Sequence, residues 1–230
     1  MQRINVSREL FREHLRNRIA TEEFDYQTLL DALREYAHPR DKITSLLRDG
    51  LIIRVKKGLY IFGDAFRRRP ISRELLANLI YGPSYISLEY ALSIHGLIPE
   101  RVETVTSVVY GRSRIFNTPA GRFTYRRIRP EAYSVGMARI EAEGGVAYLA
   151  ASPEKALADL IVSDRGTKLA SGRVMESYLL DHLRLDGDEL HRFDPALVLT
   201  IARRYRSRKI RILAEFLKER TSRERETRHE

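Results

Sequence analysis

The chain of 230 residues contains no cysteine. This absence excludes disulfide bonds, thiolate catalysis and zinc-finger ligation, and a reducing cytoplasm is the simplest location for such a protein. No apolar run approaches membrane-spanning length, and the N-terminal segment lacks the apolar block and cleavage site of a secretory signal. We therefore expect a cytoplasmic protein. Its first helix is predicted to be capped by Ser7 and to carry Leu10, Phe11, Leu15 and Ile19 on one side.

The motifs of common enzyme sites are also missing. The six histidines are scattered, with no HExxH pair and no carboxylate at metal-ligand spacing beside them. The chain has no GxxxxGK[ST] or GxGxxG phosphate loop and no GxSxG nucleophile turn. These absences predict a protein that is not an enzyme and that uses no metal or other cofactor.

One cluster, Ser152-Pro153-Glu154-Lys155 with Asp159, carries groups that could organise a metal for phosphodiester hydrolysis. A structural interpretation explains the same residues more simply. Ser152 suits a helix N-cap, Pro153 the first helical position, and Glu154 the positive end of the helix. We therefore expect this cluster to be structural rather than chemical.

Positive charge is in excess, with 41 Lys and Arg against 31 Asp and Glu, a formal net charge of +10 and a pI of about 9.9. The excess is concentrated in two places. Residues 51–80 hold seven basic and two acidic residues, and residues 201–230 hold eleven and five. Residues 21–50 and 151–200 are each net negative. Such a distribution indicates a polyanionic partner.

Residues 38–62 predict a helix followed at once by a short hairpin. Pro39 suits the first turn of a helix, and Gly50 stands where a left-handed residue would end it. Ile43, Leu46 and Leu47 fall on one face at helical spacing. The other face carries the polar residues Asp41, Thr44, Ser45 and Arg48.

The hairpin would consist of Leu51–Val55, a turn at Lys56-Lys57-Gly58, and a return over Leu59–Phe62. A helix with a polar outer face beside a basic hairpin is the second half of a winged helix-turn-helix, which suits the reading of duplex DNA. The residues predicted to contact DNA are Arg40, Lys42, Thr44, Ser45, Arg48, Arg54, Lys56, Lys57, Arg67, Arg68 and Arg69.

Different roles are expected within this set. Thr44, Ser45 and Arg48 could face base edges or phosphates, while the lysines of the turn could hold phosphates. A winged helix used only for protein docking is the alternative. The arginines at 67–69 could clamp phosphate or form a solvated linker, and those at 203–211 could form a second nucleic-acid surface or the outer face of an amphipathic helix.

The pattern along the chain predicts an α+β protein: a winged helix-turn-helix followed by a mixed α/β domain that ends in helices. We expect a DNA-binding domain over 1–66, a second domain over 70–220, and a disordered tail over 221–230, with the boundary in Gly63–Pro70. Beyond the boundary, helices are predicted at 72–81, 87–95, 153–164, 173–184, 195–205 and 208–219, and strands at 104–110, 122–128 and 146–150. Ser87 is expected to cap the helix that begins there.

Several segments resemble the AbiEi family of type IV antitoxins, also called AbiEi-like transcriptional regulators. They are GLYIF at the end of the winged helix, YISLEYALSIHGLIPE over Tyr85–Glu100, the strand pair around FTYRRI, and ASPEKALADLI over Ala151–Ile161. The similarity runs from about Tyr26 to Ile161, and the second and fourth segments are its most specific parts. The amphipathic segment before Tyr26 departs from the family pattern.

The resemblance implies a DNA-binding autorepressor encoded beside a nucleotidyltransferase-like toxin, with the N-terminal domain on repeated operator sites. It implies that the second domain counters the toxin without a stable complex. Because a domain this small has only modest affinity for a single half-site, we expect a monomer or weak dimer that is cooperative on DNA. A stand-alone winged-helix regulator with a sensing C-terminal domain is the second interpretation, and a nucleic-acid-processing enzyme is the third.

Overall fold

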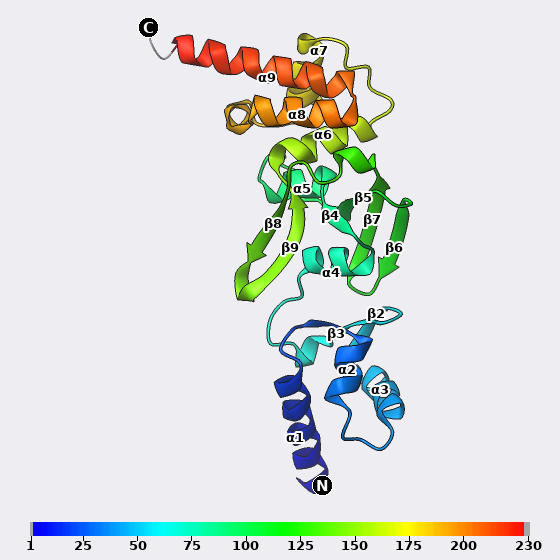
Figure 1. Cartoon of the computed structure of the whole chain (residues 1–230). Coiled ribbons are helices and arrows are strands. Elements are labelled where there is room, and N and C mark those ends of the chain that lie inside the picture. The colour runs from blue at the N-terminus through cyan, green and yellow to red at the C-terminus, as the bar shows by residue number, and fades with distance from the viewer. Residues whose placement is uncertain (1, 228–230) are drawn as a thin grey trace. The chain divides into compact units, whose positions relative to one another are not determined.

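The computed structural model describes residues 2–227, with side chains described from 10 to 223, and has a mixed α+β fold (Figure 1). About half of it is helical (49%) and a fifth is strand (21%). Internal contacts divide the chain into two compact units. The first runs to Ile80 and includes Thr118–Ala120, and the second contains the rest from Tyr81 onward. The predicted domain boundary at 63–70 therefore lies inside the first unit.

The first unit combines helices with a small sheet. Its elements are α1 (Gln2–Arg18), β1 (Glu23–Asp25), α2 (Tyr26–Ala32), α3 (Pro39–Arg48), β2 (Ile52–Lys56), β3 (Leu59–Phe62), the 3-10 helix η1 (Asp64–Phe66) and α4 (Arg73–Ile80). The three strands form an antiparallel sheet in the order β1-β3-β2. The helix and hairpin expected over residues 38–62 are present as α3, β2 and β3.

The ends of α3 follow from its sequence. Pro39 occupies the first turn, where its missing N–H removes no helical hydrogen bond. Gly50 has a φ of +67°, which a side chain would strain, so the chain can leave the helix there and enter β2. Ile43 and Leu46 are buried and belong to the core of the unit, together with Leu29 of α2.

Two details near the N-terminus correct the sequence analysis. Ser7 lies inside α1, which begins at Gln2, so Ser7 cannot be its cap. Leu15 and Ile19 are buried as expected, but Leu10 is 61% exposed, so the apolar side of α1 is narrower than the pattern suggested. The strand β1 was not predicted, because three residues are too few to show an alternating pattern.

The second unit is built on a six-stranded mixed sheet. Its strands are β4 (Ser84–Ile86), β5 (Val105–Val109), β6 (Arg114–Thr118), β7 (Gly121–Arg127), β8 (Met137–Ala142) and β9 (Val146–Ala151), in the order β6-β7-β5-β4-β9-β8. β4 pairs with β9 and β5 with β7 in parallel, whereas β4–β5 and β8–β9 are antiparallel. The three predicted strands are present as β5, β7 and β9.

Helices surround and follow this sheet. They are α5 (Leu88–Ile94), α6 (Pro153–Ser163), α7 (Gly172–Ser177), α8 (Pro195–Tyr205) and α9 (Arg208–Thr227), with shorter helices η2 (Pro130–Ala132), η3 (Glu143–Gly145), η4 (Tyr178–His182) and η5 (Gly187–Arg192). The helix expected over 173–184 is α7 continued by the π-helical turn η4. The tail expected to be disordered over 221–230 is helical as far as Thr227, and its last three residues lie outside the described residues. Over residues 2–227, no helix is both long enough and apolar enough to cross a bilayer.

Candidate nucleic-acid interface

The outer face of α3 carries the polar side chains that the sequence assigned to DNA. Arg40, Thr44 and Arg48 are exposed, and Ser45 is half-buried. The Thr44 hydroxyl donates to the carbonyl of Arg40 (3.2 Å), which ties it to the helix backbone. The Arg40 and Arg48 guanidinium groups are therefore the side chains of this face with the longest reach.

Asp49, just after α3, holds two of these side chains. Its carboxylate accepts hydrogen bonds from the Ser45 hydroxyl (3.2 Å) and from Arg48 Nε (3.4 Å). Arg48 Nη2 in turn donates to the Ser45 hydroxyl (3.4 Å). Ser45 and Arg48 are thus brought together. The Asp49 carboxylate partly neutralises Arg48, so a ligand that contacts Arg48 would have to displace this carboxylate.

Lys42 is engaged within the protein rather than directed only to solvent. Its Nζ lies 4.0 Å from the centroid of the Phe11 ring and 5.6 Å from that of Tyr36. The two rings meet edge to face, with centroids 5.6 Å apart. The lysine therefore joins α3 to α1 through a cation–π contact.

The two lysines of the hairpin have different environments. Lys57 is exposed at the turn, as is Arg54 on β2. Lys56 is half-buried, and its Nζ donates to the carbonyl of Ile80, the last residue of α4. Burial lowers the pKa of Lys56. Arg54 and Lys57 are thus the cations that this hairpin presents to solvent.

Hydrogen bonds and an ion pair hold residues 67–69, after η1, in place. Arg67 Nε donates to the carbonyl of Phe62 (3.0 Å), and its guanidinium forms an ion pair with Asp64. The backbone N–H of Arg68 donates to the carboxylate of Glu22 (3.3 Å). Arg69 is half-buried, and Arg68 is exposed. This segment is therefore tied to the first unit by hydrogen bonds, unlike a solvated linker.

The carboxylates of Glu22, just before β1, and Glu23, in β1, bind the backbone of residues 68–72. Neither residue was predicted to be functional. Glu22 and Arg16 form a buried ion pair with two hydrogen bonds (3.0 and 2.6 Å), and Glu22 also accepts from Arg68. Glu23 accepts from the backbone N–H of Ser72 (2.6 Å). Burial raises the pKa of Glu23, against the opposing effects of that hydrogen bond and of the positive charge of Arg69.

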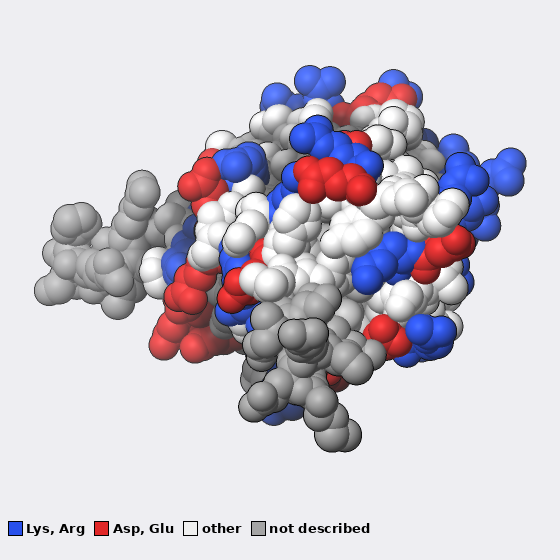
Figure 2. All heavy atoms as spheres, turned by 90° about the horizontal axis from the view of Figure 1, so that it is seen from below, with Lys and Arg blue, Asp and Glu red and all other residues white. Residues whose placement is uncertain are grey.

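The charge distribution on the face shown in Figure 2 is mixed. Basic and acidic side chains alternate over it, and no continuous basic area is visible there. The predicted DNA-contact residues thus fall into three groups. Ser45 and Arg48 are hydrogen-bonded to each other, and Arg40, Arg54 and Lys57 are exposed. Lys42, Lys56 and Arg67 make contacts within the first unit.

In the second unit, the cluster expected to be structural caps a helix as predicted. Ser152 is the N-cap of α6, and its hydroxyl accepts from the backbone N–H of Lys155 (3.3 Å). The same hydroxyl donates to Glu154 Oε2 (2.7 Å), and Glu154 Oε1 accepts from the backbone N–H of Asp194 (3.1 Å). Asp194 is the N-cap of α8, so Glu154 joins the starts of α6 and α8.

Lys155 and Asp159 form a fully buried ion pair one helical turn apart, at 2.5 Å. The Asp159 carboxylate also accepts from the hydroxyls of Tyr85 (2.9 Å), Ser87 (2.7 Å) and Tyr205. Lys155 Nζ donates to the Tyr205 oxygen as well (3.0 Å). Burial lowers the pKa of Lys155, whereas the negative charge of Asp159 acts in the opposite direction. Burial and the Asp159 charge both raise the pKa values of Tyr85 and Tyr205.

This arrangement corrects one prediction and explains one glycine. Ser87 occupies the N-cap position of α5, but its side chain makes no capping hydrogen bond because its hydroxyl is directed to Asp159. Gly136 has a φ of +76°, and a Cβ there would lie 2.8 Å from Lys155 Cβ. The backbone can therefore pass this close to Lys155 only without a side chain.

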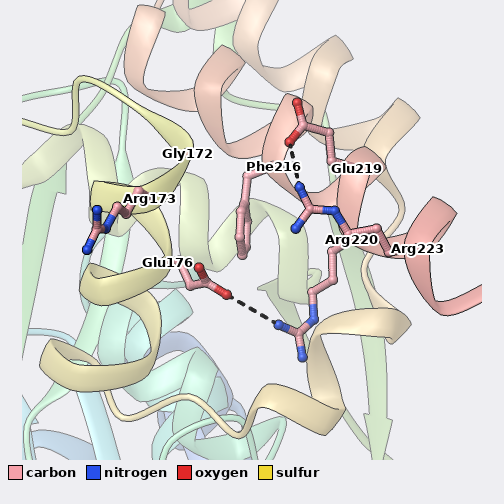
Figure 3. A pocket seen from close by; sticks show the side chains of 7 residues that line it. All are labelled: Gly172, Arg173, Glu176, Phe216, Glu219, Arg220 and Arg223. Atoms are coloured by element: carbon pink, nitrogen blue, oxygen red, sulfur yellow. Dashed lines mark ion pairs between the residues drawn. The ribbon is translucent and has the colours of Figure 1, made fainter.

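A hollow of about 410 Å³ lies between α7 and α9 (Figure 3). Its lining includes Phe216, two glutamates and three arginines, of which Arg220 pairs with Glu176 (3.7 Å) and Arg223 with Glu219 (3.9 Å). The apolar side of α9 is buried, and the arginines of α8 and α9 named in the sequence analysis are exposed. One ion pair between α9 and α7 and one within α9 thus account for much of the charge of this hollow.

Within the part of the chain that the structure describes, no three His, Cys, Asp or Glu residues are grouped to hold a metal ion. The sequence matches no protein-family model, and no curated protein matches it either. The resemblance to AbiEi antitoxins therefore stays a prediction from the motifs quoted above.

Proposed function

We propose that the protein binds duplex DNA through α3 and the β2–β3 hairpin, acting as a winged helix-turn-helix repressor of its own gene. The observation that carries this proposal is the direct succession of α3, β2 and β3 over one core, with polar and basic side chains exposed on the outer face of the helix and at the turn. Such a helix fits the major groove, and such a hairpin can reach the adjacent phosphates.

The environments of the side chains assign them different parts in this function. Arg54 and Lys57 are exposed and suit phosphate contacts, which strengthen binding to any sequence. Arg48 and Ser45 lie on the helix and suit base edges, once DNA displaces Asp49 from Arg48. Lys56 contributes less, because its ammonium group is bound to the Ile80 carbonyl.

The test is a fluorescence anisotropy titration of the full-length chain with a duplex from upstream of its own gene. The Arg54→Ala/Lys57→Ala variant should lose affinity for all duplexes, and the slope of log K against log salt should fall in magnitude by about 1.8, at about 0.9 per lost phosphate contact. Arg48→Ala should also change sequence preference. The Lys168→Ala/Arg173→Ala variant, which removes two exposed cations from the second unit, serves as the control. Unchanged affinity in the hairpin and helix variants would place DNA recognition elsewhere.

We further propose that the protein is an antitoxin that counters a nucleotidyltransferase-like toxin without forming a stable complex with it. The two most specific motifs of the resemblance, over residues 85–100 and 151–161, support this part. Co-expression with the product of the neighbouring gene should restore growth if that gene encodes such a toxin. Continued growth arrest, or an unrelated neighbouring gene, would favour a stand-alone regulator.

A further inference from the structure

Six exposed arginines lie on or beside the two strands at one edge of the six-stranded sheet. They form the arginine cluster, which consists of Arg112, Arg114, Arg122, Arg126, Arg127 and Arg129. They lie on and beside β6 and β7, and β6 is the outermost strand at this end of the sheet (Figure 1). Residues 104–130 contain no Asp or Glu, and the nearest acidic residues in the sequence are Glu103 and Glu131.

Two hydrogen bonds donated by backbone N–H groups join the end of β7 to the chain before β6. The N–H of Arg127 donates to the Ser113 hydroxyl (3.0 Å), and the N–H of Ile128 donates to the carbonyl of Val109 (2.8 Å). The loop before β6 is therefore fixed against the end of β7. Arg112 therefore lies near the end of β7 that carries Arg127 and Arg129, whereas Arg122 lies at the start of that strand.

None of the six guanidinium groups has a carboxylate partner among the described residues. Elsewhere in the same unit, exposed arginines do find partners: Arg184 pairs with Glu100 (3.0 Å), and Arg139 pairs with Glu141. Like charges fixed near one another on a sheet repel, and a bound polyanion relieves that repulsion. The cluster thus has the charge complementarity of a phosphate-binding surface.

Apolar side chains lie among these arginines. Tyr110, which follows β5, is 46% exposed, and Ile115 on β6 is 59% exposed. The Tyr110 ring is held edge to face against Tyr133, with centroids 5.2 Å apart. Surfaces that bind single strands combine cations for phosphates with aromatic rings on which bases stack. A duplex keeps its base faces inside the stack, so it would offer no base to stack on the Tyr110 ring.

We propose that the arginine cluster, with Tyr110, binds single-stranded nucleic acid. This site lies on the second unit and does not depend on α3 or the hairpin. The arginines hold consecutive phosphates, and an unstacked base lies against Tyr110.

The experiment uses the full-length chain and a labelled single-stranded oligouridylate, titrated by fluorescence anisotropy at several salt concentrations. Arg112→Gln/Arg129→Gln should weaken binding about tenfold and reduce the salt slope by about 1.4, at about 0.7 per phosphate on a single strand. Arg165→Gln/Arg173→Gln removes two exposed arginines elsewhere in the unit and should leave both quantities near wild type. Tyr110→Ala should weaken binding about tenfold, as expected for the loss of one stacked base, whereas Tyr110→Phe should bind like wild type.

Three outcomes would overturn this proposal. Wild-type protein does not bind the oligouridylate, or both double variants weaken binding equally, or the cluster variant loses more affinity for a random duplex than for the single strand. The last result would identify a duplex surface instead. The Arg54→Ala/Lys57→Ala variant should keep its affinity for the oligouridylate, so a failure of this proposal can be told from a failure of the proposed DNA-binding function.

Discussion

Replacing Lys155 by Met should destabilise the protein strongly, because it leaves the Asp159 carboxylate buried without a cation. Lys155 and Asp159 both have no exposed surface, and the carboxylate accepts from four donors, Lys155 Nζ and the hydroxyls of Tyr85, Ser87 and Tyr205. Removing one partner of such a pair typically lowers the free energy of unfolding by about 3–5 kcal/mol. That is a large part of the about 5–15 kcal/mol that stabilises a typical domain.

The three hydroxyl donors to Asp159 would remain after Lys155→Met, so most of the loss should come from the missing charge. Methionine is unbranched and occupies nearly the same space, so packing contributes little. The double variant Lys155→Met/Asp159→Asn removes both charges, and its loss should be clearly smaller than the sum of the two single losses.

Urea unfolding of the full-length chain, followed by circular dichroism, measures these free energies. Lys168→Met, at an exposed position, is the matched control and should stay within about 0.5 kcal/mol of wild type. A loss below about 1 kcal/mol for Lys155→Met, or additive losses in the double variant, would refute the account of a coupled buried pair.

Three further changes test other parts of the structure by the same unfolding measurement. Ser152→Ala should lower the free energy of unfolding by about 1 kcal/mol through the lost cap of α6, and an unchanged value would show that the cap is not needed. Gly136→Ala should cost about 2 kcal/mol or more, because of its positive φ and the 2.8 Å approach to Lys155, whereas Gly172→Ala, with open space around it, should have little effect. Burial raises the pKa of Glu23 above 4.5, so folding favours its protonated form, and this contribution to stability is lost as pH rises through the raised value. Glu23→Gln should therefore flatten the pH dependence of stability above 4.5, and identical wild-type and variant profiles would contradict this assignment.

The parts of the fold that the sequence predicted well are those with local signals. Pro39 and Gly50 mark the ends of α3, and the β-branched run of β5 indicates its strand, as do Val146 and Tyr148 in β9. The strand β4 was missed because its three residues are too few to show a pattern, although all three are buried. The outer strands β6 and β8 were missed because exposed strands lack the apolar alternation that identifies a half-buried one.

The end of α9 shows where composition misleads. The segment after Lys218 contains no apolar residue, which predicted disorder, yet it is helical as far as Thr227. Arginine and glutamate are good helix formers, and Glu219 and Arg223 pair across one turn. The buried residues Leu213 and Leu217 hold the first part of α9 in place. The helix can therefore extend beyond Lys218 without a separate, unfavourable nucleation step.

The candidate sites were only partly predictable for a different reason. The sequence placed cations on α3 and the hairpin, but nothing local indicated that Lys42 would face two rings or that Lys56 would bind the end of α4. The arginine cluster was missed because its members are divided between two segments that only the sheet brings together. Side-chain contacts between residues far apart in the sequence depend on the tertiary structure, which the periodicity of apolar residues along the chain does not indicate.

The spacing of the Asp159 partners bears on the timing of synthesis. Tyr85 and Ser87 precede Asp159 by 74 and 72 positions, and Tyr205 follows it by 46. Closing loops of these lengths is entropically unfavourable until the surrounding elements are in place. On the ribosome, the cluster can be completed only after Tyr205 has emerged. Until then the Asp159 carboxylate lacks one of its hydroxyl donors, so this unit completes its buried cluster late in synthesis.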